Sequence, residues 1–260
     1  MMKRPSRALP VGIFWARFIM IICIGQNIHD KLPENEEDRP MTFSILAQDL
    51  STGALGGAAA TGSLCVGGWV LRGDSRMGLS ASQGAAPSTM WGEDVLARMG
   101  AGEPAEAALA RVVAPDAGRE WRQLAALDRQ GGTACHTGAQ NTAWRGALVA
   151  PGLVVSGNLL AGPEVLEALR DGYRGATGPL AERLLAALAA AERAGGDSRG
   201  LQSAALLVVS DAAPPLSLRV DWAENPIAAL SALHARSQQG EYAAWLPCVP
   251  TRDDPERAHG

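Results

Sequence analysis

The sequence predicts an α+β fold, in which runs of strands and runs of helices follow one another along the chain. Polar and apolar residues alternate over 42–47, which is typical of a half-buried strand. Within 179–194, Leu180, Leu184 and Leu188 recur at helical spacing among charged positions, which indicates an amphipathic helix. The predicted order of elements is strands, helices, strands, helices, strands and a final helix. This order favours layered α+β packing over regular βαβ winding.

The first predicted elements form a β-hairpin. Turn-forming residues at 49–53 separate the strand at 42–47 from a second strand at 55–61. Gly56 and Gly57 carry no side chain in this second strand, and three alanines follow them. We therefore expect other backbone or a ligand to approach this strand closely. Two further strands are predicted at 65–70 and 77–82.

The middle of the chain is predicted to contain two helices and then three strands. Pro87 and Ser88 precede a helical pattern that extends to Met99, and Pro104 begins a second helix that extends to Val112. The strands are expected at 121–128, 133–137 and 152–156. The segment 129–132 joins the first two of them as a hairpin.

The last third of the chain alternates helices and strands. Pro163 at a first helical position and the carboxylate of Glu164 in the positively polarised first turn predict a helix over 164–173. The amphipathic helix over 179–194 ends at Gly195 and Gly196. Strands are then expected at 204–209 and 216–220, followed by a closing helix at 226–235.

Length and composition predict one domain, 41–237, between a leader at 1–40 and a C-terminal tail at 238–260. The net charge of −4 and the scattered Lys and Arg residues argue against nucleic acid as a partner. The four cysteines lie far apart without a CxxC pair, and no two histidines have helical ligand spacing, which argues against a zinc site and a disulfide scaffold. We therefore expect no metal and no cofactor, and a reducing compartment.

The leader has two interpretations. Basic residues, an apolar stretch and a charged run follow one another as in a secretory signal, but Arg17 interrupts the stretch and no small-x-small cleavage site follows it. The uninterrupted part, 18–24, is too short for a membrane span. Export is the less favoured interpretation. The other is that translation starts at Met41 and the protein is cytoplasmic.

Several ordered segments resemble one protein family. They are Met41-Thr42-Phe43-Ser44-Ile45, His136-Thr137-Gly138, Gly157-Asn158 before Gly162-Pro163-Glu164-Val165, and the run from Gly195 to Leu206. Together these segments resemble the uncharacterised bacterial family called domain of unknown function 1028, over about 41–235. The resemblance implies the fold of N-terminal-nucleophile (Ntn) hydrolases, a four-layer αββα sandwich with two stacked sheets between helical layers. Relatives often have a cysteine between His136 and Trp144 and a glutamine at the position of Ser156, and this chain has neither.

Thr42 is the candidate nucleophile. If Met41 is removed, Thr42 carries a free α-amino group beside its hydroxyl, and the amine can act as the base. If the preceding residues stay attached, the same nitrogen is a peptide amide and cannot do so. The alternative is an ordinary strand threonine.

Three further side chains are candidates for the same site. His136 has the pKa range for proton transfer, or it is a hydrogen-bonded structural imidazole. Asn158 could donate its amide to an oxyanion, or Gly157-Asn158 is a turn pair. Gln83 has the same two interpretations, as a substrate-binding or a structural residue.

The run from Gly195 to Gln202 is the most distinctive motif. Its glycines permit tight turns that could direct backbone N–H groups and the Arg199 guanidinium toward a carboxylate. Asp197, Arg199, Gln202 and Ser203 are therefore candidate substrate-binding residues. The alternative is a helix-to-strand connection braced by Asp197 and Arg199.

The leading hypothesis is an Ntn-type amidohydrolase that cleaves an amide bond of a small or peptide-like substrate. The alternative is a non-catalytic protein on the same fold that binds a small anion or metabolite, and a third hypothesis is a purely structural subunit. A small molecule is the expected partner. Because layered α+β folds of this kind often pair, we also expect a homodimer.

Overall fold

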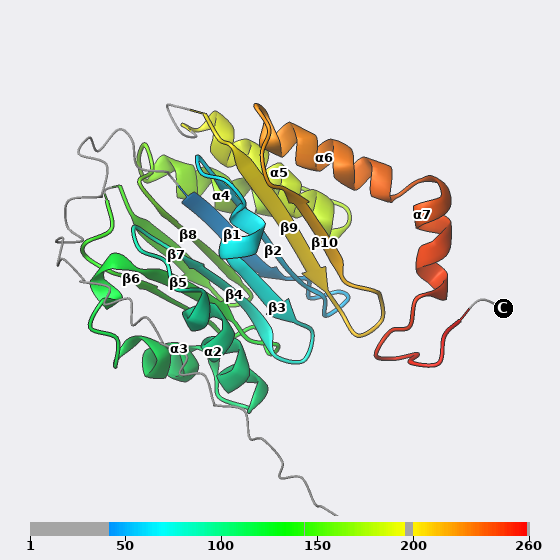
Figure 1. Cartoon of the computed structure of the whole chain (residues 1–260), viewed down its shortest axis with the longest axis horizontal. Helices are drawn as coiled ribbons and strands as arrows, with labels where there is room; N and C mark the ends of the chain where they lie inside the picture. Colours follow the sequence, from blue (N-terminus) through cyan, green and yellow to red (C-terminus); the bar gives the residue numbers. More distant parts are fainter. Residues whose placement is uncertain (1–41, 143, 196–199, 259–260) are drawn as a thin grey trace, which may run out of the picture. The chain divides into compact units, whose positions relative to one another are not determined.

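Two antiparallel sheets organise the residues that the computed structural model describes, 42–142, 144–195 and 200–258 (Figure 1). The larger sheet has six strands in the order β10-β9-β2-β1-β8-β7, and the smaller has four in the order β3-β4-β5-β6. The strands are β1 (Thr42–Gln48), β2 (Leu55–Thr61), β3 (Leu71–Asp74), β4 (Gly78–Gln83), β5 (Gln123–Leu127), β6 (Thr133–Thr137), β7 (Gly146–Ala150), β8 (Leu153–Asn158), β9 (Ser203–Val209) and β10 (Leu216–Val220).

Seven α-helices lie within the same described ranges, in agreement with the predicted α+β class. They are α1 (Val66–Trp69), α2 (Thr89–Gly100), α3 (Ala105–Val113), α4 (Glu164–Gly175), α5 (Leu180–Arg193), α6 (Pro226–Ser237) and α7 (Gly240–Trp245), with short 3₁₀ turns η3 (Arg119–Trp121) and η4 (Leu246–Cys248). Helices α4 and α5 pack against the six-stranded sheet, whereas α2 and α3 pack against the four-stranded sheet. None of the helices in the described part is long and apolar enough to cross a membrane.

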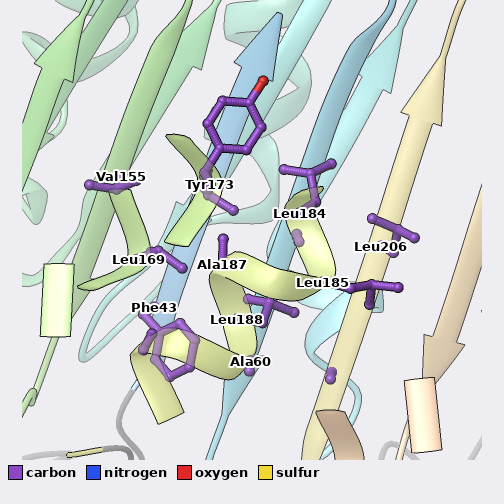
Figure 2. Close-up of a cluster of buried hydrophobic side chains, with 14 of the residues drawn as sticks. Phe43, Ala60, Val155, Leu169, Tyr173, Leu184, Leu185, Ala187, Leu188 and Leu206 are labelled. Carbon is purple, nitrogen blue, oxygen red and sulfur yellow. The ribbon is translucent and has the colours of Figure 1, made fainter. Parts of the chain in front are cut away.

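The alternation in β1 separates two cores. Phe43 and Ile45 pack in the core beneath α4 and α5, where Leu184 and Leu188 of α5 lie over the strands (Figure 2). Leu46 points to the opposite face and packs in a second core with residues of the four-stranded sheet. The predicted amphipathic helix is thus confirmed, because its leucines cover the first of these cores.

The core between the two sheets consists mainly of small and β-branched side chains. Ala59 and Val154 of the larger sheet meet Ala81, Ala125 and Leu127 of the smaller one. A third core, on the other face of the smaller sheet, joins its strands to α2 and α3. The described residues thus form three cores, one beneath α4 and α5, one that contains residues of both sheets, and one between the smaller sheet and the helices α2 and α3.

The predicted hairpin at the start of the domain is confirmed. Strands β1 and β2 pair in register from Thr42 opposite Thr61 to Gln48 opposite Leu55. At the two glycines of β2, side chains fill the space where backbone or a ligand was expected. A Cβ atom at Gly56 would lie 2.7 Å from Leu184 Cδ1 and 2.9 Å from Leu180 Cδ2, so the missing side chain makes room for leucines of α5.

The predicted strand at 65–70 is wrong. Cys65 has a left-handed backbone conformation with φ of 60°, and the helix α1 begins directly after it. The backbone of α1 lies close to β9 and β10, since a Cβ atom at Gly67 would lie 2.7 Å from Arg219 Cγ and 2.8 Å from Ala205 Cβ. The edge strands β3 and β7 and the helix α7 were not predicted, because these short segments lack a strong alternating or amphipathic pattern.

Candidate functional site

A layer of polar side chains lies at one end of the core between the sheets. Thr42 at the start of β1 is paired with Thr61 on β2 and with Asn158 on β8. Residues that are opposite each other in neighbouring strands share a face of the sheet. Because Leu46 on β1 faces the inter-sheet core, the alternation of β1 directs Thr42 and its two partners toward the same space.

A pocket of about 290 Å³ opens at this polar end. The six-stranded sheet contributes Thr42 and Thr61, and the four-stranded sheet contributes Gln83. The full lining among the described residues is Thr42, Thr61, Ser63, Leu64, Val66, Trp69, Val70, Gln83, Gly84, Ala85 and Pro87. None of these described residues is charged. Leu64 and Trp69 are about half exposed, at 53% and 54%, so the pocket has an apolar rim.

The Thr42 hydroxyl is held within the pocket wall. The residue is only 8% exposed, and its Oγ1 lies 2.9 Å from Thr61 Oγ1. Either hydroxyl could donate in this hydrogen bond. Met41 lies outside the described residues. A threonine hydroxyl at a pocket wall is a potential nucleophile when a neighbouring base accepts its proton.

Asn158 supplies a buried donor beside Thr42. It is the last residue of β8, is 4% exposed and lies directly opposite Thr42 in the sheet. Its Nδ2 has no hydrogen-bond partner among the described residues. Most buried polar atoms are paired, and an unpaired one costs about 1–3 kcal/mol. An oxygen atom bound next to Thr42 could accept the missing hydrogen bond, although Asn158 is not among the residues that line the pocket.

A pair of buried glutamines determines the chemistry of the opposite wall. Gln123 Nε2 donates to Gly146 O and to Gly157 O, both at 3.0 Å. Because carbonyl oxygens only accept, these contacts fix which end of the Gln123 amide is nitrogen. Gln123 Oε1 therefore accepts from Gln83 Nε2 at 2.7 Å. This leaves Gln83 Oε1, which is buried and has no partner among the described residues, as an acceptor.

Gln123 was not predicted from the sequence as a site residue. The only signal in the sequence was a polar residue at the first position of the predominantly apolar strand β5, and the structure buries this side chain fully. A glutamine at a strand end usually indicates exposure rather than burial. Only the contact with Gly146 and Gly157 of the other sheet shows its role.

Gln202 and Ser203, at the end of the distinctive run that begins at Gly195, hold the loop that follows β2. Ser203 Oγ donates to Ser63 O at 2.7 Å and accepts from Val66 N at 3.0 Å, and Gln202 Nε2 donates to Gly62 O at 2.7 Å. These bonds hold the loop that carries lining residues, but neither Gln202 nor Ser203 lines the pocket. Asp197 and Arg199, the other two predicted binding residues of this motif, lie outside the described residues.

The structure does not bring His136 to this site. His136 is on β6, and its ring contacts Trp91 of α2 edge-on, with centroids 5.9 Å apart. Its Nε2 lies 3.1 Å from Arg119 O. Ala134 lies two residues before His136 and therefore on the same face of β6. Because Ala134 packs in the core with α2 and α3, this face is turned away from the space between the sheets.

Two observations in the described ranges concern metal binding and the thiol of Cys135. Those ranges hold no group of three or more His, Cys, Asp or Glu residues that could bind a metal ion. Cys135 faces the inter-sheet core, and burial raises the pKa of its thiol to about 12. At neutral pH this thiol is therefore protonated and a poor nucleophile.

Comparison with known proteins places the pocket residues inside a family match. The model of a family described as "Family of unknown function (DUF1028)" matches residues 42–230. The crystal structure of protein SPO2555 from Silicibacter pomeroyi, which carries the same family model, is similar to this chain with 49% sequence identity and a TM-score of 0.81. The similarity covers 85% of this chain and 96% of that one. No curated protein matches.

Proposed function

The chain belongs to the DUF1028 family, and from this premise we propose that it is an amide hydrolase with Thr42 as its nucleophile. The observation that carries the proposal is the position of Thr42, whose hydroxyl lies in a pocket wall directly opposite the unpartnered amide of Asn158. We also propose the αββα sandwich of Ntn hydrolases for this domain. The support is that helices pack on the outer face of each sheet while the two sheets contact each other.

The reaction requires a free amine on Thr42. Thr42 Oγ1 attacks the substrate carbonyl carbon, and its proton passes to the α-amino group that removal of Met41 exposes. Asn158 Nδ2 donates to the oxyanion of the tetrahedral intermediate. When the intermediate collapses, the C–N bond breaks and the leaving amine takes the proton from the α-ammonium group. Water then hydrolyses the ester to Thr42 and regenerates the hydroxyl.

The binding alternative uses the same pocket. If Met41 is retained, the nitrogen of Thr42 is a peptide amide and the base is missing. The neutral lining and the two unpartnered amide atoms would still form a ligand site. Whether the nitrogen of Thr42 is a free amine or a peptide amide therefore distinguishes hydrolysis from binding alone.

The test compares Thr42→Ala with Ser44→Ala in protein whose translation starts at Met41. Ser44 is the next residue of β1 on the same face and pairs with Ser156 Oγ at 3.1 Å, but it does not line the pocket. Intact-mass measurement first establishes that Met41 has been removed. We expect Thr42→Ala to lower the turnover of any substrate in a panel of small amides by roughly 10³-fold or more, and Ser44→Ala to retain it. Unchanged turnover by Thr42→Ala would exclude Thr42 as the nucleophile.

A further inference from the structure

We propose that the pocket selects a small uncharged amide whose N–H group donates a hydrogen bond to Gln83 Oε1. The inference deepens the proposed function and rests on it for the reaction that follows binding. The binding step itself depends only on the pocket. Its substrate class is a primary or secondary carboxamide.

The first support is the fixed orientation of the two glutamines. Two backbone carbonyls accept from Gln123 Nε2, so Gln123 presents its oxygen to Gln83. Rotation of the Gln83 amide would place two oxygen atoms against each other. Gln83 Oε1 is thus held as an acceptor that no described residue satisfies. Since Gln83 is 1% exposed and lines the pocket, a donor on a bound ligand could satisfy this oxygen.

The second support is the absence of charge in the described lining. While the nitrogen of residue 42 is a peptide amide, as in the full chain, a carboxylate or phosphate moved into this pocket would lose water without gaining a cation from the described lining side chains. The rim residues Leu64 and Trp69 suit an apolar group on the ligand. A volume of about 290 Å³ restricts that ligand to a small molecule.

The third support is complementarity with an amide group. An amide has one acceptor, the carbonyl oxygen, and at least one N–H donor when it is primary or secondary. Asn158 Nδ2 lacks an acceptor and Gln83 Oε1 lacks a donor. An ester matches only Asn158, and a carboxylate presents two acceptors and a charge. Of the three groups, only the amide has both the acceptor that Asn158 Nδ2 lacks and the donor that Gln83 Oε1 lacks.

The experiment measures binding of three matched probes to the full chain carrying Thr42→Ala, which removes turnover as a factor. The probes are 3-phenylpropionamide, methyl 3-phenylpropionate and 3-phenylpropionate, and isothermal titration gives their dissociation constants. We expect the amide to bind about tenfold or more tightly than the ester and the carboxylate. The same titrations with Thr42→Ala/Gln83→Met should show no preference for the amide.

Gln48→Met is the matched control in the same Thr42→Ala background. Gln48 is at the other end of β1, where its Nε2 donates to Arg129 O at 3.0 Å, so this substitution should leave the preference unchanged. Equal binding of the three probes, tighter binding of the carboxylate, or no binding of the amide would overturn the inference, whether or not Gln83→Met folds. A preference that persists in folded Gln83→Met would overturn the role of Gln83. If the preference depends on Gln83 but the protein with Thr42 has no amidase activity, the proposed function fails while this inference stands.

Discussion

At the scale of single residues, the site combines one hydroxyl with two amides whose hydrogen bonds are incomplete. Thr42 provides the hydroxyl, Asn158 a free donor and Gln83 a free acceptor. Leaving two buried polar atoms unpaired reduces stability, and use of the atoms by a ligand or a reaction is one reason why a folded protein keeps them. This is the basis on which we propose that Asn158 stabilises developing negative charge beside Thr42.

Replacing Asn158 with Ala should separate activity from stability. In protein with Thr42 exposed, we expect kcat to fall about 10²–10³-fold, as when an oxyanion donor is lost, with a smaller change in KM. The melting temperature should stay nearly unchanged, because the substitution removes a donor that has no partner. Steady-state kinetics and calorimetry check the two expectations. Asn225→Ala, at an exposed position before α6, should alter neither, and a parallel loss of kcat and stability in Asn158→Ala would indicate a structural role instead.

At the scale of elements, the packing of α5 on β2 positions the strand that carries Thr61. Leu180 and Leu184 of α5 fill the space that Gly56 leaves open. The sheet and helix can therefore approach closely without a gap in the core beneath α4 and α5. Bulk at Gly56 would move the helix away from the sheet or force the leucines out of their preferred rotamers.

The substitution Gly56→Ala is expected to destabilise the domain by about 1–3 kcal/mol through this crowding. Denaturant unfolding followed by circular dichroism measures the effect. Gly175→Ala is the matched control, because a Cβ atom there meets nothing within 4 Å at the end of α4. The control should be close to neutral, and equal stability of the two variants would refute the packing argument.

At the scale of the whole described domain, the C-terminal segment joins turns of both sheets. Arg252 Nη2 lies 2.6 Å from Asp74 Oδ2, before the β3–β4 turn, and Arg252 Nε lies 3.8 Å from Asp211 Oδ1, between β9 and β10. Asp253 N also donates to Asp211 O at 3.1 Å. The β3–β4 turn is at the end of the smaller sheet that is remote from Gln83. The β9–β10 turn is at the end of the larger sheet that is remote from Thr42. The segment thus stabilises the end of the domain opposite the pocket.

Replacing Arg252 with Gln should lower the free energy of unfolding by up to about 1 kcal/mol, since the ion pairs are partly exposed. The loss should shrink as salt is added, because salt screens exposed charges. Thermal unfolding at two ionic strengths tests this. Arg257→Gln breaks only a local pair with Asp254 and should have a smaller effect. An identical response of both variants would show that the bridge between the turns contributes nothing.

The element pattern was largely predictable because it depends on local chemistry. Alternation in β1, leucine spacing in α5 and the turn residues of the first hairpin are properties of neighbouring residues, and the predicted elements are present there. The segment that forms α1 was predicted as a strand because its local sequence is an apolar run. That run does not reveal the left-handed backbone at Cys65 or the packing of Gly67 against Ala205. Strands β3 and β7 at sheet edges were missed for lack of a strong pattern.

The α+β class, the family and Thr42 as the residue to examine were all predictable from the sequence. The three-dimensional contacts establish which of the candidate residues lie together. They pair Thr42 with Asn158, turn His136 to the other face of its sheet and connect Gln83 through Gln123 to the opposite sheet. The physical reason is that the face of a side chain on a strand follows from local alternation, whereas strand order and register depend on contacts between distant segments.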